Sequence, residues 1–404
     1  MKRFLQAHAT HPDWRVALAL AAAQIESQRN RSAGENGGAP QPTLGWVYFT
    51  DHYAGAAPAL LDDLRRRWPG VAWVGAAGVG IAASGVEYFD EPALCLLLAE
   101  LPREQFRVFS GARPLGDFTA HTAQVHADPA TADLGELIAD MSDRTTTGYL
   151  FGGLASGRTQ TLHIAEAVLR GGLSGVGFSR AVSLVSRVSQ GCQPVGPVRS
   201  VTAAQRNVIT ALDGEPALDC LLRDLQIESA EPRDALPRLR QTLVGLSDRR
   251  DTALARAGQF GTDTRVRHLI GLDPARRGIA VGDNIEAGMQ LTFCSRNTEA
   301  ARRDLMRICA EIREEVEPET LPLEAALARK GADPGDAVPH GIAGAIYVSC
   351  AGRGGPHFGA PSAELAIVRH ALGDVPLAGF FAAGEVARHH LYGYTGVLTV
   401  FRSA

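Results

Sequence analysis

Short apolar runs of strand length recur along this chain, and polar loops or segments with helical periodicity separate them. In the first half, the run at 44–49 precedes an amphipathic segment at 58–67 whose leucines recur at helical spacing. A second apolar run at 71–75 leads into a glycine-rich bend, and a further run follows at 93–98. The pattern predicts a strand, a helix, a strand, a bend and a strand, in that order.

The same order returns near the C-terminus. An apolar run at 345–348 is followed by a glycine-rich loop, a helical segment at 363–372 and apolar runs at 375–381 and 396–401. We interpret the two segments as copies of one α/β unit. The pattern predicts an α/β fold of mixed sheets, built from two related halves with helices packed on them. The strand–helix–strand parts are expected to form right-handed crossovers.

Length and composition predict three regions, because 404 residues exceed one ordinary domain. Residues 1–42 are expected to form an N-terminal helix, at 12–29, and a linker rich in Gly, Asn and Pro. The first main region is predicted at 43–227 and the second at 240–402. A charged stretch at 228–238 is the predicted boundary between them.

Charge and hydropathy exclude several classes of partner. The net charge is −4 and no basic stripe with interleaved aromatics occurs, so neither nucleic acid nor an anionic membrane is an expected partner. No apolar run near the N-terminus reaches the ~20 residues of a membrane span, and polar residues interrupt any secretory signal there. A cytoplasmic protein is therefore expected.

The six cysteines are scattered and form no C-x-x-C pair, so the sequence predicts neither a zinc site nor a thioredoxin motif. Most of them are expected to be reduced and buried. Cys350 differs because it stands in the glycine-rich loop SCAGRGGPHFG, at 349–359, directly after an apolar run.

That loop also carries a guanidinium at the expected end of a strand. The planar fork of Arg353 could clamp a carboxylate, the glycines would let backbone N–H groups approach a ligand, and Cys350 would line the pocket. Ligands of α/β proteins bind beyond the carboxyl ends of strands, where this loop is expected to lie. The alternative interpretation is an ordinary strand-to-helix turn with a surface arginine.

Four motifs in this order resemble the FIST-domain family, whose name stands for F-box and intracellular signal transduction. They are GGLASG at 152–157, a glycine- and proline-rich motif at 190–218, SCAGRGG at 349–355 and GFFAAGEVARHHLYGYTGVLTV at 379–400. The resemblance covers most of the chain. It implies a sensory module of bacterial signalling that binds small ligands such as amino acids. In a subset of the family, the ligand is haem and the signal is nitric oxide.

The resemblance also implies where the ligand binds. Cys350, Arg353 and the Gly-Glu pair that ends at Glu385 match the family motifs, whereas the N-terminal copy lacks both the arginine and the glutamate. Glu385 would meet an ammonium group of the ligand or orient Arg353, although a structural salt bridge between them is an equal alternative. The implied ligand-binding residues are Cys350, Arg353, Glu385, Tyr394, Ser156 and Arg158.

The sequence thus predicts a sensory protein that binds a small amino-acid-like or anionic metabolite and has no catalytic residues. Its signalling partner, a kinase or a cyclic-dinucleotide enzyme, is expected to act in trans. No cofactor is predicted, although a haem-binding nitric-oxide sensor, with His268 as a conceivable ligand, is the binding alternative. A cysteine-dependent enzyme that uses Cys350 is the alternative of another class.

Overall fold

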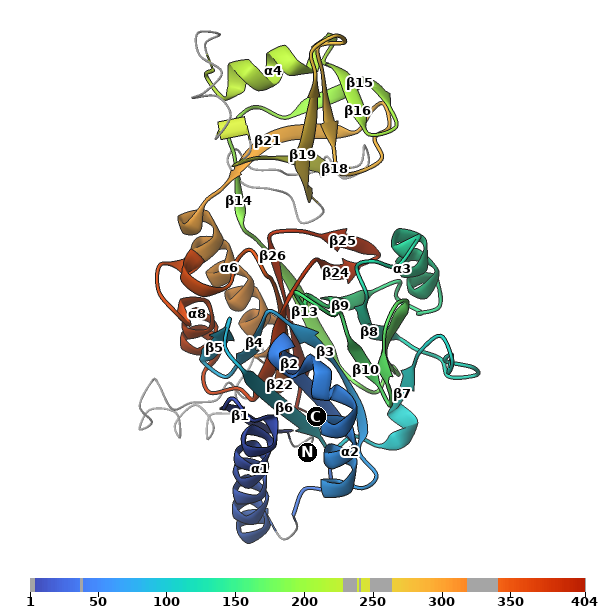
Figure 1. Cartoon of the computed structure of the whole chain (residues 1–404), viewed down its shortest axis with the longest axis vertical. Helices are drawn as coiled ribbons and strands as arrows, with labels where there is room; N and C mark the ends of the chain where they lie inside the picture. The colour runs from blue at the N-terminus through green and yellow to red at the C-terminus, as the bar shows by residue number, and fades with distance from the viewer. Residues whose placement is uncertain are drawn as a thin grey trace. The chain divides into compact units, whose positions relative to one another are not determined.

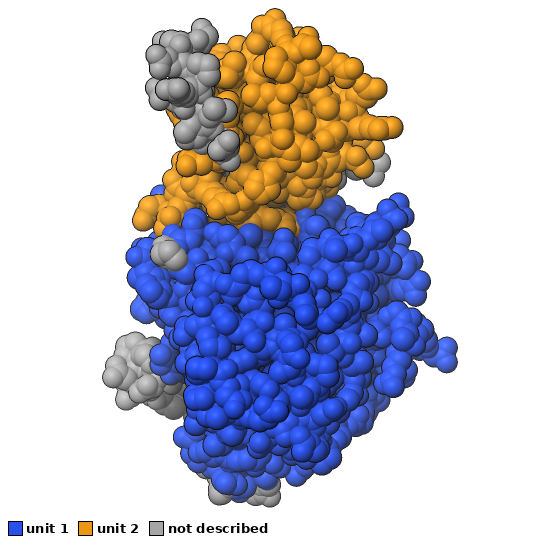
Figure 2. Space-filling model, in the orientation of Figure 1, with its two compact units in different colours: residues 1–189, 302–391, 395–404 blue, residues 190–301, 392–394 orange. Residues whose placement is uncertain are grey.

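The computed structural model describes residues 4–36, 39–227, 238–239, 241–247, 264–317 and 341–403. Figure 2 shows two compact units in different colours. Unit 1 comprises Met1–Ser189, Arg302–Leu391 and Thr395–Ala404, and unit 2 comprises Gln190–Ala301 and Tyr392–Tyr394. Most of the predicted boundary at 228–238 lies outside the described residues. None of the described helices is both long and apolar enough to cross a membrane.

The predicted α/β class with mixed sheets is confirmed, and unit 1 contains three sheets of six strands each (Figure 1). The first sheet has the order β1 (Phe4–Thr10), β6 (Ala93–Ala99), β2 (Leu44–Thr50), β3 (Ala72–Gly78), β10 (His163–Ala165), β11 (Val168–Leu169). The second has the order β7 (Phe106–Phe109), β12 (Leu173–Phe178), β8 (Thr122–Ala127), β9 (Leu150–Leu154), β24 (Glu385–Arg388), β25 (His390–Tyr392). The third has the order β13 (Leu184–Gln190), β26 (Thr395–Arg402), β22 (Ile342–Cys350), β23 (Leu377–Ala382), β4 (Gly80–Ala83), β5 (Val86–Phe89).

These three sheets are built from three copies of one unit. In each, two parallel strands are joined by a helix: β2 and β3 by α2 (Ala57–Arg67), β8 and β9 by α3 (Leu134–Asp143), and β22 and β23 by α8 (Ala363–Leu372). The next two strands of each copy form a hairpin that joins the sheet of another copy. The β4–β5 hairpin extends the third sheet, β10–β11 extends the first, and β24–β25 extends the second. The two copies expected from the sequence are present, and a third, from β7 to β12, lies between them.

A glycine at the same place in each copy confirms the repeat. On the second parallel strand, Gly75, Gly152 and Gly379 stand opposite Val47, Val125 and Tyr347. A Cβ atom on these glycines would lie 1.8, 1.9 and 1.7 Å from the carbonyl oxygens of those residues. The paired backbones therefore approach more closely than any side chain would allow.

The N-terminal region differs from its predicted form. A first strand, β1, precedes the helix, and α1 (Trp14–Asn36) continues through residues that were predicted to form a linker. Polar residues without a proline can extend an existing helix into solvent, so their composition did not end it. Buried residues of α1 and α2 form one core with the first sheet, including Leu18, Ile25 and Leu60.

Buried aromatic and polar side chains link the inward faces of the three sheets. The indole Nε1 of Trp46 donates to Gln124 Oε1 at 2.5 Å, and Gln124 Nε2 donates to Tyr48 OH at 2.7 Å. The ring of Tyr48 stacks on Phe380 with centroids 5.1 Å apart, and Trp46 packs against Phe401 at 5.4 Å. These five side chains are fully buried, so the centre of unit 1 is a packed core.

Unit 2 is a closed antiparallel barrel. Its six strands pair in a ring: β15 (Arg199–Gln205), β16 (Val208–Leu212), β20 (Gly278–Val281), β19 (Arg265–Asp273), β18 (Thr242–Ser247) and β21 (Gln290–Arg296), which returns to β15. Two short strands, β14 (Cys192–Pro194) and β17 (Glu215–Pro216), pair at its edges, and α4 (Ala217–Asp224) packs on its core. A closed ring leaves no long free edge.

The barrel is an insertion before the copy that contains β22 and β23. It follows β13 in the chain and precedes α6 (Thr298–Val316), the helix that leads to β22. Its strands come from both of the regions predicted at 43–227 and 240–402, so the compact units do not coincide with those regions. Three short 3-10 helices complete the described elements, η1 (Asp51–Ala56), η2 (Arg103–Gln105) and η4 (Gly355–Phe358).

Candidate functional site

The glycine-rich loop predicted as a ligand site does follow a strand. β22 ends at Cys350, the chain turns with Arg353 N donating to Cys350 O at 2.8 Å, and η4 then leads towards α8. Cys350 is half-buried, whereas the other five cysteines are buried. The loop therefore places the one cysteine that is not buried at the carboxyl end of a parallel strand.

The guanidinium of Arg353 points into the protein and pairs with Glu364 of α8. Its Nη2 lies 2.7 Å from Glu364 Oε1 and its Nε donates to the same oxygen at 2.9 Å, while Nη1 donates to Ser189 O at 3.0 Å. Both side chains are only 1% exposed. Burial alone would lower the pKa of Arg353, but the charge of Glu364 raises it, so the arginine is charged.

Glu364 is the centre of this cluster. Tyr347 OH donates to Glu364 Oε1 at 2.6 Å and Ser349 Oγ donates to both carboxylate oxygens at 3.1 Å. The ring of Phe358 lies 5.1 Å from the Arg353 guanidinium carbon. Groups of the same chain thus bind the guanidinium of Arg353. A ligand anion would have to compete with Glu364 for this guanidinium.

Glu385 lies in the first position of β24 and is fully buried. Its Oε2 accepts hydrogen bonds from Thr395 N at 3.1 Å and from Thr395 Oγ1 at 2.8 Å. Burial raises the pKa of Glu385 to about 8, and hydrogen bonds from Thr395 and Cys350 and the charge of Arg353 offset only part of this effect. A half-buried thiol and a largely protonated carboxyl therefore meet at the end of β22.

This raised pKa makes a testable contribution to stability. The folded state keeps a proton on Glu385 between pH 4.5, its ordinary pKa, and about pH 8, whereas the unfolded state releases it. The stability that Glu385 contributes is therefore full below pH 4.5 and is lost as the pH rises to about 8. We expect the unfolding free energy of the wild type minus that of Glu385→Gln to fall over this range in urea titrations. A difference that stays constant with pH would show that the pKa is not raised.

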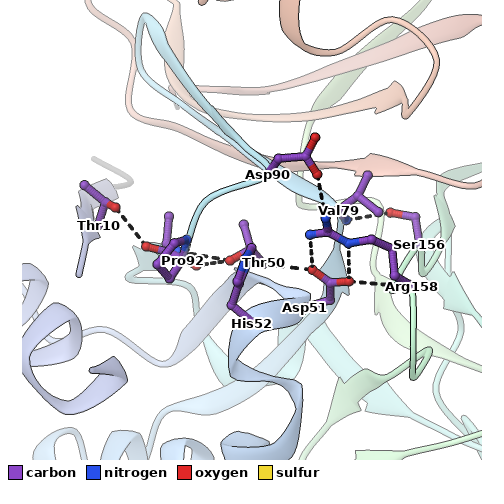
Figure 3. Close-up of polar contacts among 10 residues, drawn as sticks. Thr10, Thr50, Asp51, His52, Val79, Asp90, Pro92, Ser156 and Arg158 are labelled. Atoms are coloured by element: carbon purple, nitrogen blue, oxygen red, sulfur yellow. Dashed lines mark hydrogen bonds and ion pairs between the residues drawn. The ribbon is translucent and has the colours of Figure 1, made fainter. Parts of the chain in front are cut away.

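Ser156 and Arg158, in the segment that follows β9, make polar contacts away from Cys350 with different partners (Figure 3). Arg158 binds Asp51 through Nε, Nη2 and its backbone N at 2.8–2.9 Å, and its Nη1 lies 2.8 Å from Asp90. Burial would raise the pKa of Asp51, but the hydrogen bonds and charge of Arg158 lower it. Ser156 Oγ accepts from Val79 N at 3.0 Å and donates to Phe381 O. Both residues thus join copies of the repeat.

Tyr394 belongs to unit 2, where its hydroxyl lies 2.9 Å from His268 Nε2 and the guanidinium of Arg296 lies 3.8 Å from the centre of its ring. Burial, followed by the charge of Arg296, lowers the pKa of His268. Because Tyr394 occupies Nε2, an axial haem bond from that atom would require this hydrogen bond to break. Among the described residues there is no group of three metal-ligating side chains.

The structure therefore brings together only part of the residue set implied by the sequence. Cys350 and Glu385 are in contact beside Arg353, whereas Arg158 binds Asp51 and Ser156 joins Val79 to Phe381. The motifs gave no indication of Glu364. A signal for it existed, because Glu364 stands four residues before Val368 and therefore shares the apolar, buried face of α8. An acidic residue on a buried face needs a cationic partner.

Comparisons with known proteins agree with this architecture. The FIST N domain matches residues 43–215 and the FIST C domain matches residues 217–388. An uncharacterized protein of Mycobacterium tuberculosis is 32% identical over 411 residues, which cover 97% of each chain. An uncharacterized protein of Mycobacterium bovis is 31% identical over 410 residues, again 97% of each chain. FIST domains are sensory domains of signal transduction. The resemblance of the four motifs is thus confirmed, and the chain belongs to the FIST family.

Proposed function

We propose that this protein senses a small amino-acid-like or other anionic metabolite, which Cys350 and Glu385 recognise at the end of β22. One observation carries the proposal: the carboxyl of Glu385, which is fully buried, touches the one cysteine that is not buried. Burial raises the pKa of this carboxyl to about 8. Strongly shifted pKa values of this kind are concentrated at functional sites. A signalling partner in trans would respond to the ligand-bound form of the protein.

The chemistry of this site suits a carboxylate or a zwitterion. At neutral pH the protonated Glu385 can donate a hydrogen bond to a ligand carboxylate, and its ionised form can meet an ammonium group. The charges of Arg353 and Glu364 cancel, so the loop adds no net negative charge that would repel an anion. Arg353 would support the site by holding the loop that carries Cys350.

A binding role fits Cys350 better than a nucleophilic one. Reactive cysteines are held as thiolates by a nearby cation or a helix N-terminus. Cys350 instead hydrogen-bonds to the Glu385 carboxyl, and the nearest guanidinium is bound by Glu364. We therefore propose a ligand-binding protein rather than an enzyme.

Thermal-shift measurements with a panel of amino acids and 2-keto acids test this proposal. A ligand at 100 times its Kd adds about 2.7 kcal/mol to the unfolding free energy and so raises the melting temperature. We expect at least one compound to stabilise the wild type, and Glu385→Gln to weaken its binding at least tenfold. The proposal fails if no compound stabilises the protein, or if Glu385→Gln binds as tightly as the wild type.

Glu87→Gln is the matched control for that experiment. Glu87 is also buried, and burial raises its pKa to about 7. Its Oε1 accepts from Ser362 N at 2.7 Å, directly before α8. If both variants lost binding equally, the loss would reflect buried carboxyls in general and not the site at Cys350.

A further inference from the structure

A cavity of about 450 Å³ lies in unit 1 and contains none of the residues discussed above as a ligand site. The starts of β8 and β9, the segment at 180–187 that enters β13, Thr399 of β26 and Glu315 of α6 line it. Pockets for small molecules typically have volumes of about 300–1,000 Å³. This cavity is thus large enough for a small metabolite.

Hydroxyl groups and aromatic rings line its inner part. Ser186 Oγ and Thr399 Oγ1 are hydrogen-bonded at 2.8 Å, and the Tyr149 hydroxyl hydrogen-bonds to Ser186. Burial raises the pKa of Tyr149, while this bond and the charges of Arg388 and Arg187 partly offset the rise. Thr399 is fully buried and Phe151 is 1% exposed, so the aromatic and hydroxyl groups belong to the rigid sheets and are in place before any ligand binds.

Positive charge exceeds negative charge among the lining residues. Arg187 is bound by Glu311 at 3.2 Å and by Glu315 at 2.5 Å. Arg180, at the exposed entrance, forms no ion pair with any residue that the structure describes. Two arginines and one glutamate therefore line the cavity. Because Glu311 and Glu315 bind Arg187, Arg180 is the guanidinium that an entering anion would meet without a competing carboxylate.

We propose that this cavity binds a small organic anion. Its carboxylate or phosphate group would meet Arg180, and its ring or hydrocarbon part would pack on Phe151 and Tyr149. Ser186 and Thr399 would hydrogen-bond to a polar substituent. This second site goes beyond the proposed function, since it shares no residue with Cys350 and Glu385.

Isothermal titration calorimetry with three probes of similar size tests the inference. Phenyl phosphate, benzoate and the neutral benzyl alcohol share a ring and differ in the group that Arg180 would bind. We expect at least one anion to bind the full-length protein with one-to-one stoichiometry, and benzyl alcohol to bind at least tenfold more weakly. Preference for phosphate or carboxylate identifies the head group. If neither anion binds, or if the alcohol binds equally well, the inference is overturned.

Single-residue variants then test whether the anion binds in this cavity. Arg180→Gln should weaken binding at least tenfold, and Ser183→Phe should do so by filling the entrance. Arg113→Gln is the matched control, because Arg113 is exposed and lies outside the cavity. Equal losses in Arg113→Gln and Arg180→Gln would mean non-specific attraction and would overturn the site. Glu385→Gln should leave anion binding in this cavity unchanged. A negative result for the cavity can therefore be distinguished from a negative result for the site at Cys350.

Discussion

Glu364→Gln is expected to destabilise unit 1 by about 3–5 kcal/mol, the usual cost of removing one partner from a buried ion pair. The change leaves the charge of Arg353, which is 1% exposed, without the carboxylate that lies 2.7 Å away. It also weakens the hydrogen bonds that Tyr347 and Ser349 donate to that carboxylate. Water cannot replace these interactions in a packed interior, so the full desolvation cost of the charge appears.

Urea unfolding followed by tryptophan fluorescence measures this loss. All four tryptophans, Trp14, Trp46, Trp68 and Trp73, lie in unit 1, so their signal reports on that unit. Asp374→Asn is the control: the ion pair of Asp374 with Arg369 has a distance of 2.5 Å, but both side chains are 57% exposed. Exposed pairs contribute about 0–1 kcal/mol. Similar losses in the two variants would contradict a buried structural role for Glu364.

A double variant separates the ion pair from the packing around it. Arg353→Met and Glu364→Leu together remove both charges and keep most of the apolar volume. We expect the double variant to lose less stability than the sum of the two single variants, because neither charge remains buried alone. Strict additivity would show that the two side chains act independently.

Gly379→Ala is expected to prevent unit 1 from folding. A Cβ atom at this position would lie 1.7 Å from the carbonyl oxygen of Tyr347, well inside van der Waals contact. The clash is with the backbone of the paired strand β22, so no side-chain rotation relieves it, and the sheet would have to separate. We expect the unfolding free energy to fall by more than the ~0.5–3 kcal/mol of typical substitutions. In the measurement, the cooperative transition in tryptophan fluorescence would disappear.

Gly135→Ala is the matched control for this prediction. Gly135 lies in α3, and a Cβ atom there would meet nothing within 4 Å. Because alanine favours helix over glycine by about 1 kcal/mol, this variant should be as stable as the wild type or slightly more stable. If Gly379→Ala unfolded with the same midpoint as Gly135→Ala, the close approach of β22 and β23 would be refuted.

The sequence predicted two copies of the repeat because their apolar runs and amphipathic helices lie close together in the chain. The third copy was missed because its strands β7 to β12 are spread over 106–178 and are separated by long polar and glycine-rich segments. The exchange of hairpins between sheets also could not be predicted from the sequence. Whether β4 returns to β3 or joins β23 depends on which sheet edges meet in space, and the local pattern is the same in either case.

The candidate site, too, could be predicted from the sequence only in part. The motif placed Cys350 correctly at the end of a strand, and the position of Glu385 at the start of the next sheet element was visible as a Gly-Glu pair. The sequence could not show that Arg353 pairs with Glu364, because the two lie eleven positions apart across a turn and only packing brings them to 2.7 Å.

By itself, the sequence determined the α/β class, the family and the strand ends at which polar residues gather, since these follow from local periodicity and from motifs of contiguous residues. The tertiary structure alone decided which charges neutralise one another and which remain available. Arg353 is bound by Glu364, whereas no described residue pairs with Arg180 at the cavity entrance. The physical reason is that charge, desolvation and hydrogen bonding act over a few ångströms in space, at distances that chain separation does not encode.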